Sequence, residues 1–205
     1  MEIEFNKINP EETAILVIDI QNDFCSKEGF PVKNWGHDVS HMDEIVEKIK
    51  KFLGEAYIQG MDILYTQLIY DPENMPKSLI NKLGEVIGKF AAPNSWGIEF
   101  YKIKPPKDRI FTKYCFNAFT NPKLYTYLKE KNIKNLIFVG FNSNICVEST
   151  ARAALDLGFN ITLLKDLIGT TTFMQGHERE MLSTFQIIFG NVISSEDILK
   201  LWKEK

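Results

Sequence analysis

One cysteine stands where an apolar run gives way to a helical pattern. Cys146 follows "LIFVGFNSNI" and precedes "VESTARAALDLGF". The first turn of a helix offers free backbone N–H groups and partial positive charge, so it favours a thiolate and can hold an oxyanion. Ser143 or Asn144 can cap such a helix. Cys146 is therefore a candidate nucleophile, and the alternative is a small buried residue that packs the helix on a sheet.

Two charged residues end other apolar runs of the chain. Asp19 follows "AILVI" and Lys113 follows "RIFT". A carboxylate at the end of a buried strand needs a partner or a chemical role, because its desolvation is costly. Asp19 can accept a thiol proton and return it to a leaving group, and Lys113 can pair with Asp19 and stabilise a thiolate. The alternatives are a turn aspartate and a surface lysine whose stem covers apolar residues.

Short apolar runs alternate with helical patterns along the chain, which is typical of an α/β fold. We expect one doubly wound domain over 1–205, with a mostly parallel sheet of about six strands and helices on both faces. Ligands of such folds bind beyond the carboxyl ends of the strands, where the three candidate residues would meet. The expected strands are 13–20, 61–69, 108–113, 134–141, 160–166 and a short one in "NVIS", and the expected helices are 41–60, 122–132, 145–157, 175–190 and 194–205.

Composition narrows the class of protein. The chain has 205 residues, of which 44% are hydrophobic and 25% are charged, with a net charge of −3. Nothing in this balance favours nucleic acid or a membrane surface as a partner. No apolar run reaches the roughly 18 residues that span a bilayer, and acidic residues precede the first apolar run, unlike a secretory signal. Three cysteines without paired spacing indicate reduced thiols, so we expect a cytoplasmic protein.

Several motifs in order resemble the isochorismatase-like cysteine hydrolase superfamily, which includes nicotinamidases, N-carbamoylsarcosine amidases, ureidoacrylate amidohydrolases and isochorismatases. The resemblance runs from "ILVIDIQNDFC" through "FTKYCFNAFTNPKL" and "LIFVGFNSNICVESTARAALDLGFNITLLKD" to "GHEREMLSTF". It implies a catalytic triad of Asp19, Lys113 and Cys146. A "GxxTxxCV" motif of the family maps onto "GFNSNICV", with serine in place of threonine. The motif implies a cis peptide bond at Asn142–Ser143 and an oxyanion hole made there with Cys146.

The resemblance also separates subfamilies. Nicotinamidases carry an aspartate and histidine metal site after the second strand, whereas this chain reads "TQLIYDPENMP" there, without histidine. His37, His41 and His177 give no close ligand pair with suitable carboxylates, so we expect no metal and no cofactor. The segments "SWGIEF" and "KYCFNAFTNPKL" look most similar to ureidoacrylate-type and other N-carbamoyl or amide hydrolases.

Six residues near the triad are candidates for substrate binding. Two follow Asp19 and can orient either it or the substrate, one ends the second strand, and three follow Lys113. Each aromatic residue among them can instead be part of the core. The six are Gln21, Asn22, Gln67, Phe116, Asn117 and Phe119.

These observations predict a cysteine-dependent hydrolase that cleaves an amide or ureido C–N bond of a small molecule through a thioester. Two alternatives stay open: an isochorismatase-type vinyl-ether hydrolase, which would use the aspartate more than the thiol, and a non-catalytic small-molecule-binding member of the fold. Members of the superfamily are usually dimers or tetramers, so the resemblance implies a homodimer or homotetramer. The segment 71–104, rich in Pro, Gly and Asn, is predicted to be a lid or an interface element.

Overall fold

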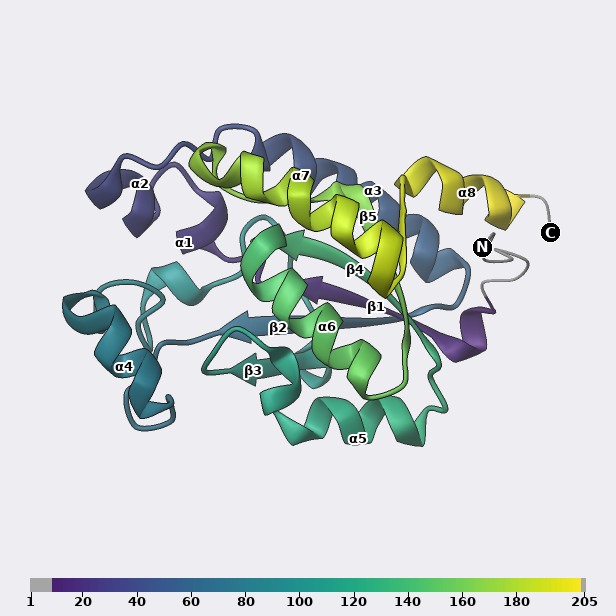
Figure 1. Ribbon diagram of the computed structural model, residues 1–205, viewed down its shortest axis with the longest axis horizontal. Coiled ribbons are helices and arrows are strands. Elements are labelled where there is room, and N and C mark those ends of the chain that lie inside the picture. Colours follow the sequence, from purple (N-terminus) through teal and green to yellow (C-terminus); the bar gives the residue numbers. More distant parts are fainter. Residues whose placement is uncertain (1–8, 204–205) are drawn as a thin grey trace.

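The central feature of the protein is one parallel six-stranded sheet. The computed structural model describes residues 9–203, and the strand order in them is β3-β2-β1-β4-β5-β6. Every neighbouring pair is parallel, and Figure 1 shows the arrowheads of β1 to β4 pointing to the same edge. The expected α/β class is therefore confirmed. The strands are β1 (Thr13–Ile18), β2 (Asp62–Leu68), β3 (Ile110–Lys113), β4 (Asn135–Phe141), β5 (Asn160–Gly169) and β6 (Asn191–Ile193).

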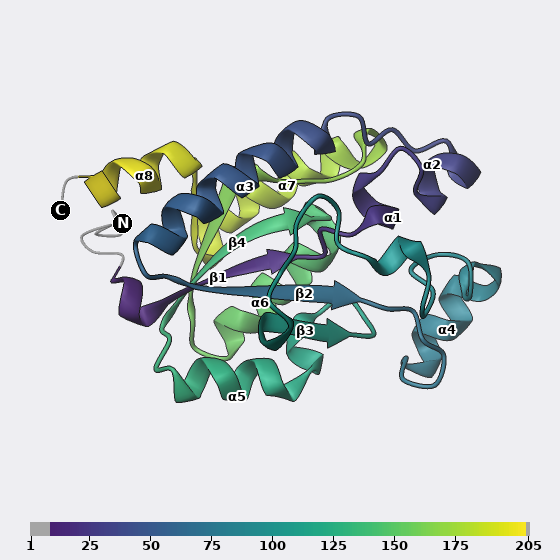
Figure 2. The same ribbon diagram turned by 180° about the vertical axis from the view of Figure 1, so that it is seen from behind.

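Helices cover both faces of this sheet. One face carries α3 and α8, where Phe52 stacks on Trp202 with 5.4 Å between ring centroids. The other face carries α5, α6 and α7, and Arg152 of α6 lies over the Phe189 ring just beyond α7. Figure 1 shows α6 and α7 in front of the sheet, and Figure 2 shows α3 in front. The helices are α3 (Met42–Ile58), α5 (Pro122–Glu130), α6 (Glu148–Asp156), α7 (Gln175–Thr184) and α8 (Ser195–Lys203).

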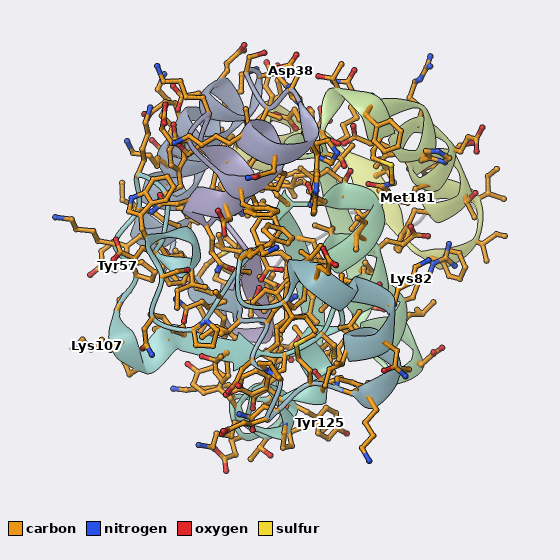
Figure 3. All side chains as sticks on the ribbon, turned by 90° about the vertical axis from the view of Figure 1, so that its left-hand side faces the viewer. Asp38, Tyr57, Lys82, Lys107, Tyr125 and Met181 are labelled. Atoms are coloured by element: carbon orange, nitrogen blue, oxygen red, sulfur yellow. The ribbon has the colours of Figure 1, made fainter. Side chains whose placement is uncertain are left out.

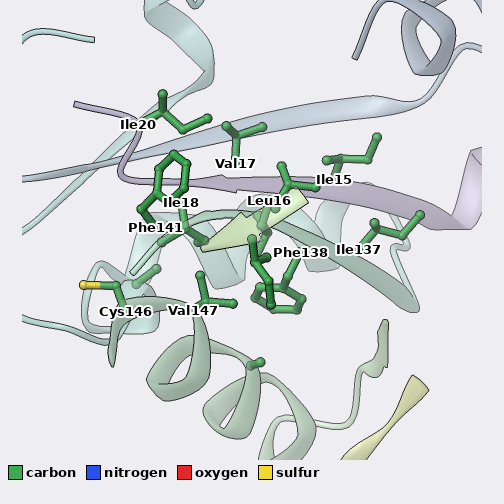
Figure 4. Packing of buried hydrophobic residues seen from close by; sticks show 14 of the residues in the cluster. Ile15, Leu16, Val17, Ile18, Ile20, Ile137, Phe138, Phe141, Cys146 and Val147 are labelled. Atoms are coloured by element: carbon green, nitrogen blue, oxygen red, sulfur yellow. The ribbon is translucent and has the colours of Figure 1, made fainter. Parts of the chain in front are cut away.

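The middle strand β1 is completely buried, because it has strands on both sides and helices on both faces. All six of its residues are 0% exposed. Its aliphatic side chains meet those of β4, as Figure 4 shows for Leu16 and Phe138. Burial of each such side chain stabilises the fold by roughly 1.5–3 kcal/mol. A rigid central strand therefore ends directly at Asp19.

Short segments gather at the carboxyl edge of the sheet. Three short helices lie there: α1 (Asn22–Cys25), α2 (Phe30–Trp35) and α4 (Lys77–Leu83). Figure 3 looks onto this edge, where Lys82 belongs to α4 and Asp38 lies in the loop after α2. The segment 71–104 contains α4 and then returns to the sheet, since Phe100 forms an isolated bridge with Gln21.

Several boundaries differ from the sequence-based ones. β1 ends at Ile18 and not at 20, because Asp19 has a left-handed backbone with φ +46°. The helix expected over 145–157 begins with a π-helical turn at Ser143–Val147. The helix expected over 175–190 ends with another at Phe185–Phe189. Within residues 9–203, no helix combines the length and apolarity needed to cross a membrane.

Candidate active site

The structure brings Asp19, Lys113 and Cys146 together at the carboxyl ends of β1, β3 and β4. The Lys113 ammonium lies 2.7 Å from Asp19 Oδ2 and 3.4 Å from Cys146 Sγ. The side chains of Asp19 and Lys113 are 0% exposed, and Cys146 is 2% exposed. Figure 4 shows the Cys146 sulfur directed away from Val147 and the core. One cation therefore bridges a carboxylate and a sulfur atom in a site shielded from bulk water.

Asp19 is held by a residue that sequence reasoning missed. The buried Thr66 hydroxyl donates to Asp19 Oδ1 at 2.6 Å and accepts a bond from the Asp19 backbone N–H at 3.2 Å. The signal that could have found Thr66 is its place near the end of β2, the neighbour of β1. One carboxylate oxygen of Asp19 thus accepts a hydrogen bond from the Thr66 hydroxyl, and the other lies beside the Lys113 ammonium.

Lys113 is positioned by three contacts. Besides Asp19 and Cys146, its ammonium donates to the Cys115 carbonyl oxygen at 3.1 Å. Burial alone would lower the pKa of Lys113, but the Asp19 carboxylate and the Cys146 sulfur raise it above its ordinary value. Lys113 therefore stays a cation at neutral pH.

The thiol of Cys146 differs from the expectation of a stabilised thiolate. Burial raises its pKa to about 12, Lys113 opposes this rise only in part, and the Asp19 carboxylate adds to it. Desolvation by burial is the largest cause of this rise, whereas the helix N-terminus had led us to expect a lowered pKa. Cys146 is a neutral thiol at rest, and a base must remove its proton during a reaction.

The turn that carries Cys146 also differs in detail. The cis peptide bond joins Phe141 to Asn142, one bond before the expected Asn142–Ser143. The Asn142 carbonyl accepts bonds from Ile145 N at 3.2 Å and Val147 N at 3.1 Å. Because this carbonyl belongs to the Asn142–Ser143 peptide, that peptide is part of the hydrogen bonding of the π-helical turn. Asn142, rather than Ser143 or Asn144, is the residue that precedes this turn.

A cavity of about 200 Å³ lies against Cys146. Aromatic side chains make up much of its wall, and the polar groups come from α1, the nucleophile turn and the end of β5. Of the six expected substrate-binding residues, only Phe116 lines it. The lining residues are Asp23, Phe24, Pro31, Trp35, His37, Val39, Leu68, Tyr70, Phe90, Phe116, Asn142, Ile145, Cys146, Thr170, Thr171, Phe173 and Met174.

Three expected substrate-binding residues instead tie chain segments together. The Gln21 amide bonds both to the carbonyl oxygen and to the N–H of Leu68, at 2.9 and 2.7 Å. Asn22 donates to the Trp96 carbonyl at 2.8 Å, and the Gln67 amide donates to the Ile98 carbonyl at 2.9 Å. These amides bond to backbone groups, so they join the 71–104 segment to the sheet edge and do not line the cavity.

The remaining two expected residues lie away from the cavity. Asn117 caps a short turn by accepting a bond from Phe119 N at 2.9 Å. Phe119 stacks on Phe159, with 6.0 Å between ring centroids. Their closeness to Lys113 in the sequence was misleading, because the chain turns away from the site after Phe116.

Sequence reasoning placed the cavity wall in the segments 24–38 and 71–104 and after Lys113, but it named few of its residues. Tyr70 and Thr170 stand just beyond β2 and β5, so their places after strands were a usable signal. Trp35 and Phe90 lie in or beside short helices without any periodic pattern, so no such signal exists for them. Within residues 9–203, no cluster of His, Cys, Asp or Glu could hold a metal ion.

Comparison with known proteins gives the family of the chain. Residues 13–197 match the model of the Isochorismatase domain family. The chain belongs to the isochorismatase family. The expectation of an enzyme of this hydrolase family is thereby confirmed.

Relatives of similar length support this assignment. The ureidoacrylate amidohydrolase RutB of Acinetobacter baylyi is 29% identical, over 98% of this chain and 88% of its own. RutB of Caulobacter segnis is 30% identical, over 93% of this chain and 85% of its own. A cysteine hydrolase structure from Pseudomonas syringae pv. phaseolicola superposes with a TM-score of 0.83 at 22% identity, covering 94% and 93% of the two chains. The last likeness shows a shared fold.

Proposed function

We propose that the protein is a cysteine amidohydrolase that cleaves an amide or ureido C–N bond of a small molecule through a thioester. The observation that carries this proposal is the position of Lys113 Nζ, 2.7 Å from Asp19 Oδ2 and 3.4 Å from Cys146 Sγ. A nucleophile, a base and a fixed cation then stand at one wall of a cavity. The relatives named as amidohydrolases support the bond type.

The first half of the reaction forms the thioester. Asp19 takes the proton of Cys146 as the sulfur attacks the carbonyl carbon, because a thiol with a pKa of about 12 does not ionise beforehand at neutral pH. Backbone N–H groups of the turn from Asn142 to Cys146 stabilise the developing oxyanion. The C–N bond then breaks, and Asp19 gives its proton to the leaving nitrogen.

The second half releases the acid. Asp19 takes a proton from a water molecule, whose oxygen attacks the thioester carbon. The C–S bond breaks, and the proton on Asp19 returns to the Cys146 sulfur. Lys113 keeps its charge throughout, because its pKa is raised, and it balances the carboxylate or thiolate beside it.

Ammonia release from a panel of amides and ureido acids tests this function. The variant Cys146→Ala should lose turnover and keep its fold, as judged by circular dichroism. The matched control is Cys115→Ala, which removes another thiol but keeps the backbone carbonyl that binds Lys113. Ammonia release that survives in Cys146→Ala would refute the thioester.

We also propose a homodimer or homotetramer. The half-exposed Trp96, in the segment expected to be a lid or an interface, supports contact between copies. Light scattering after size-exclusion chromatography measures the mass directly. A mass of one chain at all concentrations would contradict this proposal.

A further inference from the structure

The one basic side chain in the described wall of the cavity beside Cys146 is the imidazole of His37. Among the described residues that form its wall, none is Lys or Arg. The Lys113 ammonium is close to the sulfur, but it is fully buried and already paired with Asp19 at 2.7 Å. The described wall thus offers no lysine or arginine to pair with a negatively charged substrate.

The one acidic residue in the described wall of the cavity is Asp23. Asp23 is 5% exposed, and its two carboxylate oxygens accept backbone bonds from Phe30 N at 2.9 Å and Ala91 N at 2.8 Å. Backbone dipoles stabilise this carboxylate, and within residues 9–203 no ion pair neutralises it. A second carboxylate in the cavity would be repelled by Asp23 and would lose its water.

The rest of the wall is rigid and aromatic. Phe90 packs edge-to-face against Phe24, Trp35 and Tyr70, with ring centroids 5.2, 5.7 and 5.5 Å apart. Such a wall favours a flat or apolar group by dispersion and by the hydrophobic effect.

Polar atoms without partners show where a neutral substrate would be held. Asn142 Oδ1, Thr170 Oγ1 and Thr171 Oγ1 are buried, and no hydrogen-bond partner is found for them in the described structure. All three residues line the cavity. Buried polar atoms are normally bonded, so they are suited to a ligand. Each oxygen can accept a bond from an amide N–H, and the two threonine hydroxyls can also donate to a carbonyl oxygen.

We propose that this cavity takes substrates with an uncharged, largely apolar acyl group and discriminates against those that carry a carboxylate. The inference rests on the proposed amidohydrolase function for its chemistry. It separates this chain from relatives named ureidoacrylate amidohydrolases, because ureidoacrylate is a carboxylate.

Binding to the Cys146→Ala variant tests the inference without any turnover. Calorimetry compares terephthalamide with its isosteric anion 4-carbamoylbenzoate, and succinamide with succinamate. The pH is 8.5, which keeps the carboxylic acids of both anions ionised. At least one diamide should bind about 30-fold or more tightly than its anion. Equal or tighter binding of the anions, or no binding by any of the four, would overturn the inference.

The second experiment adds a cation to the wall of the cavity. Met174 is a half-buried residue of the wall, so Met174→Lys places an ammonium in the cavity and Met174→Gln is the uncharged control of similar length. In the Cys146→Ala background, the preference for the diamide should fall at least 10-fold with lysine and stay unchanged with glutamine. An unchanged preference in the lysine variant would contradict the role of charge. If the diamides bind but wild type releases no ammonia from them, the proposed function fails and the selectivity stands.

Discussion

At the scale of single residues, the charge balance of the site depends on Lys113. Its ammonium is the partner of a fully buried carboxylate, so Lys113→Met would leave Asp19 buried and unpaired. We expect this variant to lose activity and about 3–5 kcal/mol of unfolding free energy. Urea unfolding measures the loss.

The double variant Asp19→Asn with Lys113→Met separates the two roles of Lys113. It removes both charges, so it should recover most of the stability while it stays inactive. If the double variant is as unstable as Lys113→Met, the unpaired Asp19 carboxylate is not the cause of the lost stability.

We expect Thr66 to affect the proposed reaction through Asp19. Thr66→Val removes the hydroxyl that donates to Asp19 Oδ1 at 2.6 Å, and a hydrogen bond to a charged group is worth about 1.5–3 kcal/mol. We expect kcat to fall by about 10- to 100-fold, with KM little changed, because the base is misplaced while the cavity stays intact. Steady-state kinetics measures both constants. Thr66→Ser keeps the hydroxyl and should keep most of the rate, so an equal loss in both variants would contradict this role.

The three reactive residues were predictable because they stand at the ends of strands, where topology fixes their meeting place. The ionisation state of Cys146 was not, because it depends on burial that no local pattern reports. A polar residue near a site can bind either a substrate or the backbone, and the sequence does not show which. The structure shows backbone hydrogen bonds for the amides of Gln21, Asn22 and Gln67.

At the scale of elements, Gly140 sets how closely β4 approaches β1. Its φ is +113°, and a Cβ there would lie 2.1 Å from the Ile18 carbonyl oxygen, directly before Asp19. Gly140→Ala should therefore cost about 3 kcal/mol of unfolding free energy and much of the activity. Urea unfolding and kcat test this expectation.

Gly176 provides the matched control. It lies in α7 with nothing within 4 Å of an added Cβ, so Gly176→Ala should raise stability by about 0.5–1 kcal/mol through helix propensity. Equal changes of stability in Gly140→Ala and Gly176→Ala would show that the stability of the protein does not depend on the close approach of β4 to β1.

The sheet strands and long helices were predictable because they carry strong periodic or continuous apolar patterns. The short helices α1, α2 and α4 have 4, 6 and 7 residues, which is too short for a helical period to show in the sequence. These helices and the loops beside them build much of the cavity wall. The part of the site that selects a substrate is thus the part that sequence patterns describe least.

At the scale of the whole molecule, several buried groups resist losing their protons. Burial raises the pKa of Cys25 and Tyr70 above their ordinary values and that of Cys146 to about 12, while Asp19 keeps the pKa of Lys113 raised despite burial. All four pKa values move in the same direction. In the unfolded chain these groups lose their protons at lower pH than in the folded protein.

The sign of the resulting pH dependence follows by linkage. A group whose folded pKa is raised gives its full stabilisation below the unfolded pKa and loses it as pH rises toward the folded pKa. The ordinary pKa is 9.0 for the two thiols, so stability should be constant from pH 7 to 8 and fall from about pH 9 toward 12. Thermal unfolding across this range, with a reducing agent present, gives the slope.

The double variant Cys25→Ala with Cys146→Ala tests which groups cause this alkaline loss. It removes two of the four groups, so its Tm should fall less steeply above pH 9 than that of wild type, whatever its stability at pH 7. Each curve is compared with its own value at pH 7, which removes the cost of the cavities that the substitutions create. Parallel curves would show that the two thiols ionise equally in the folded and unfolded chains, and would contradict the raised pKa values of the two thiols.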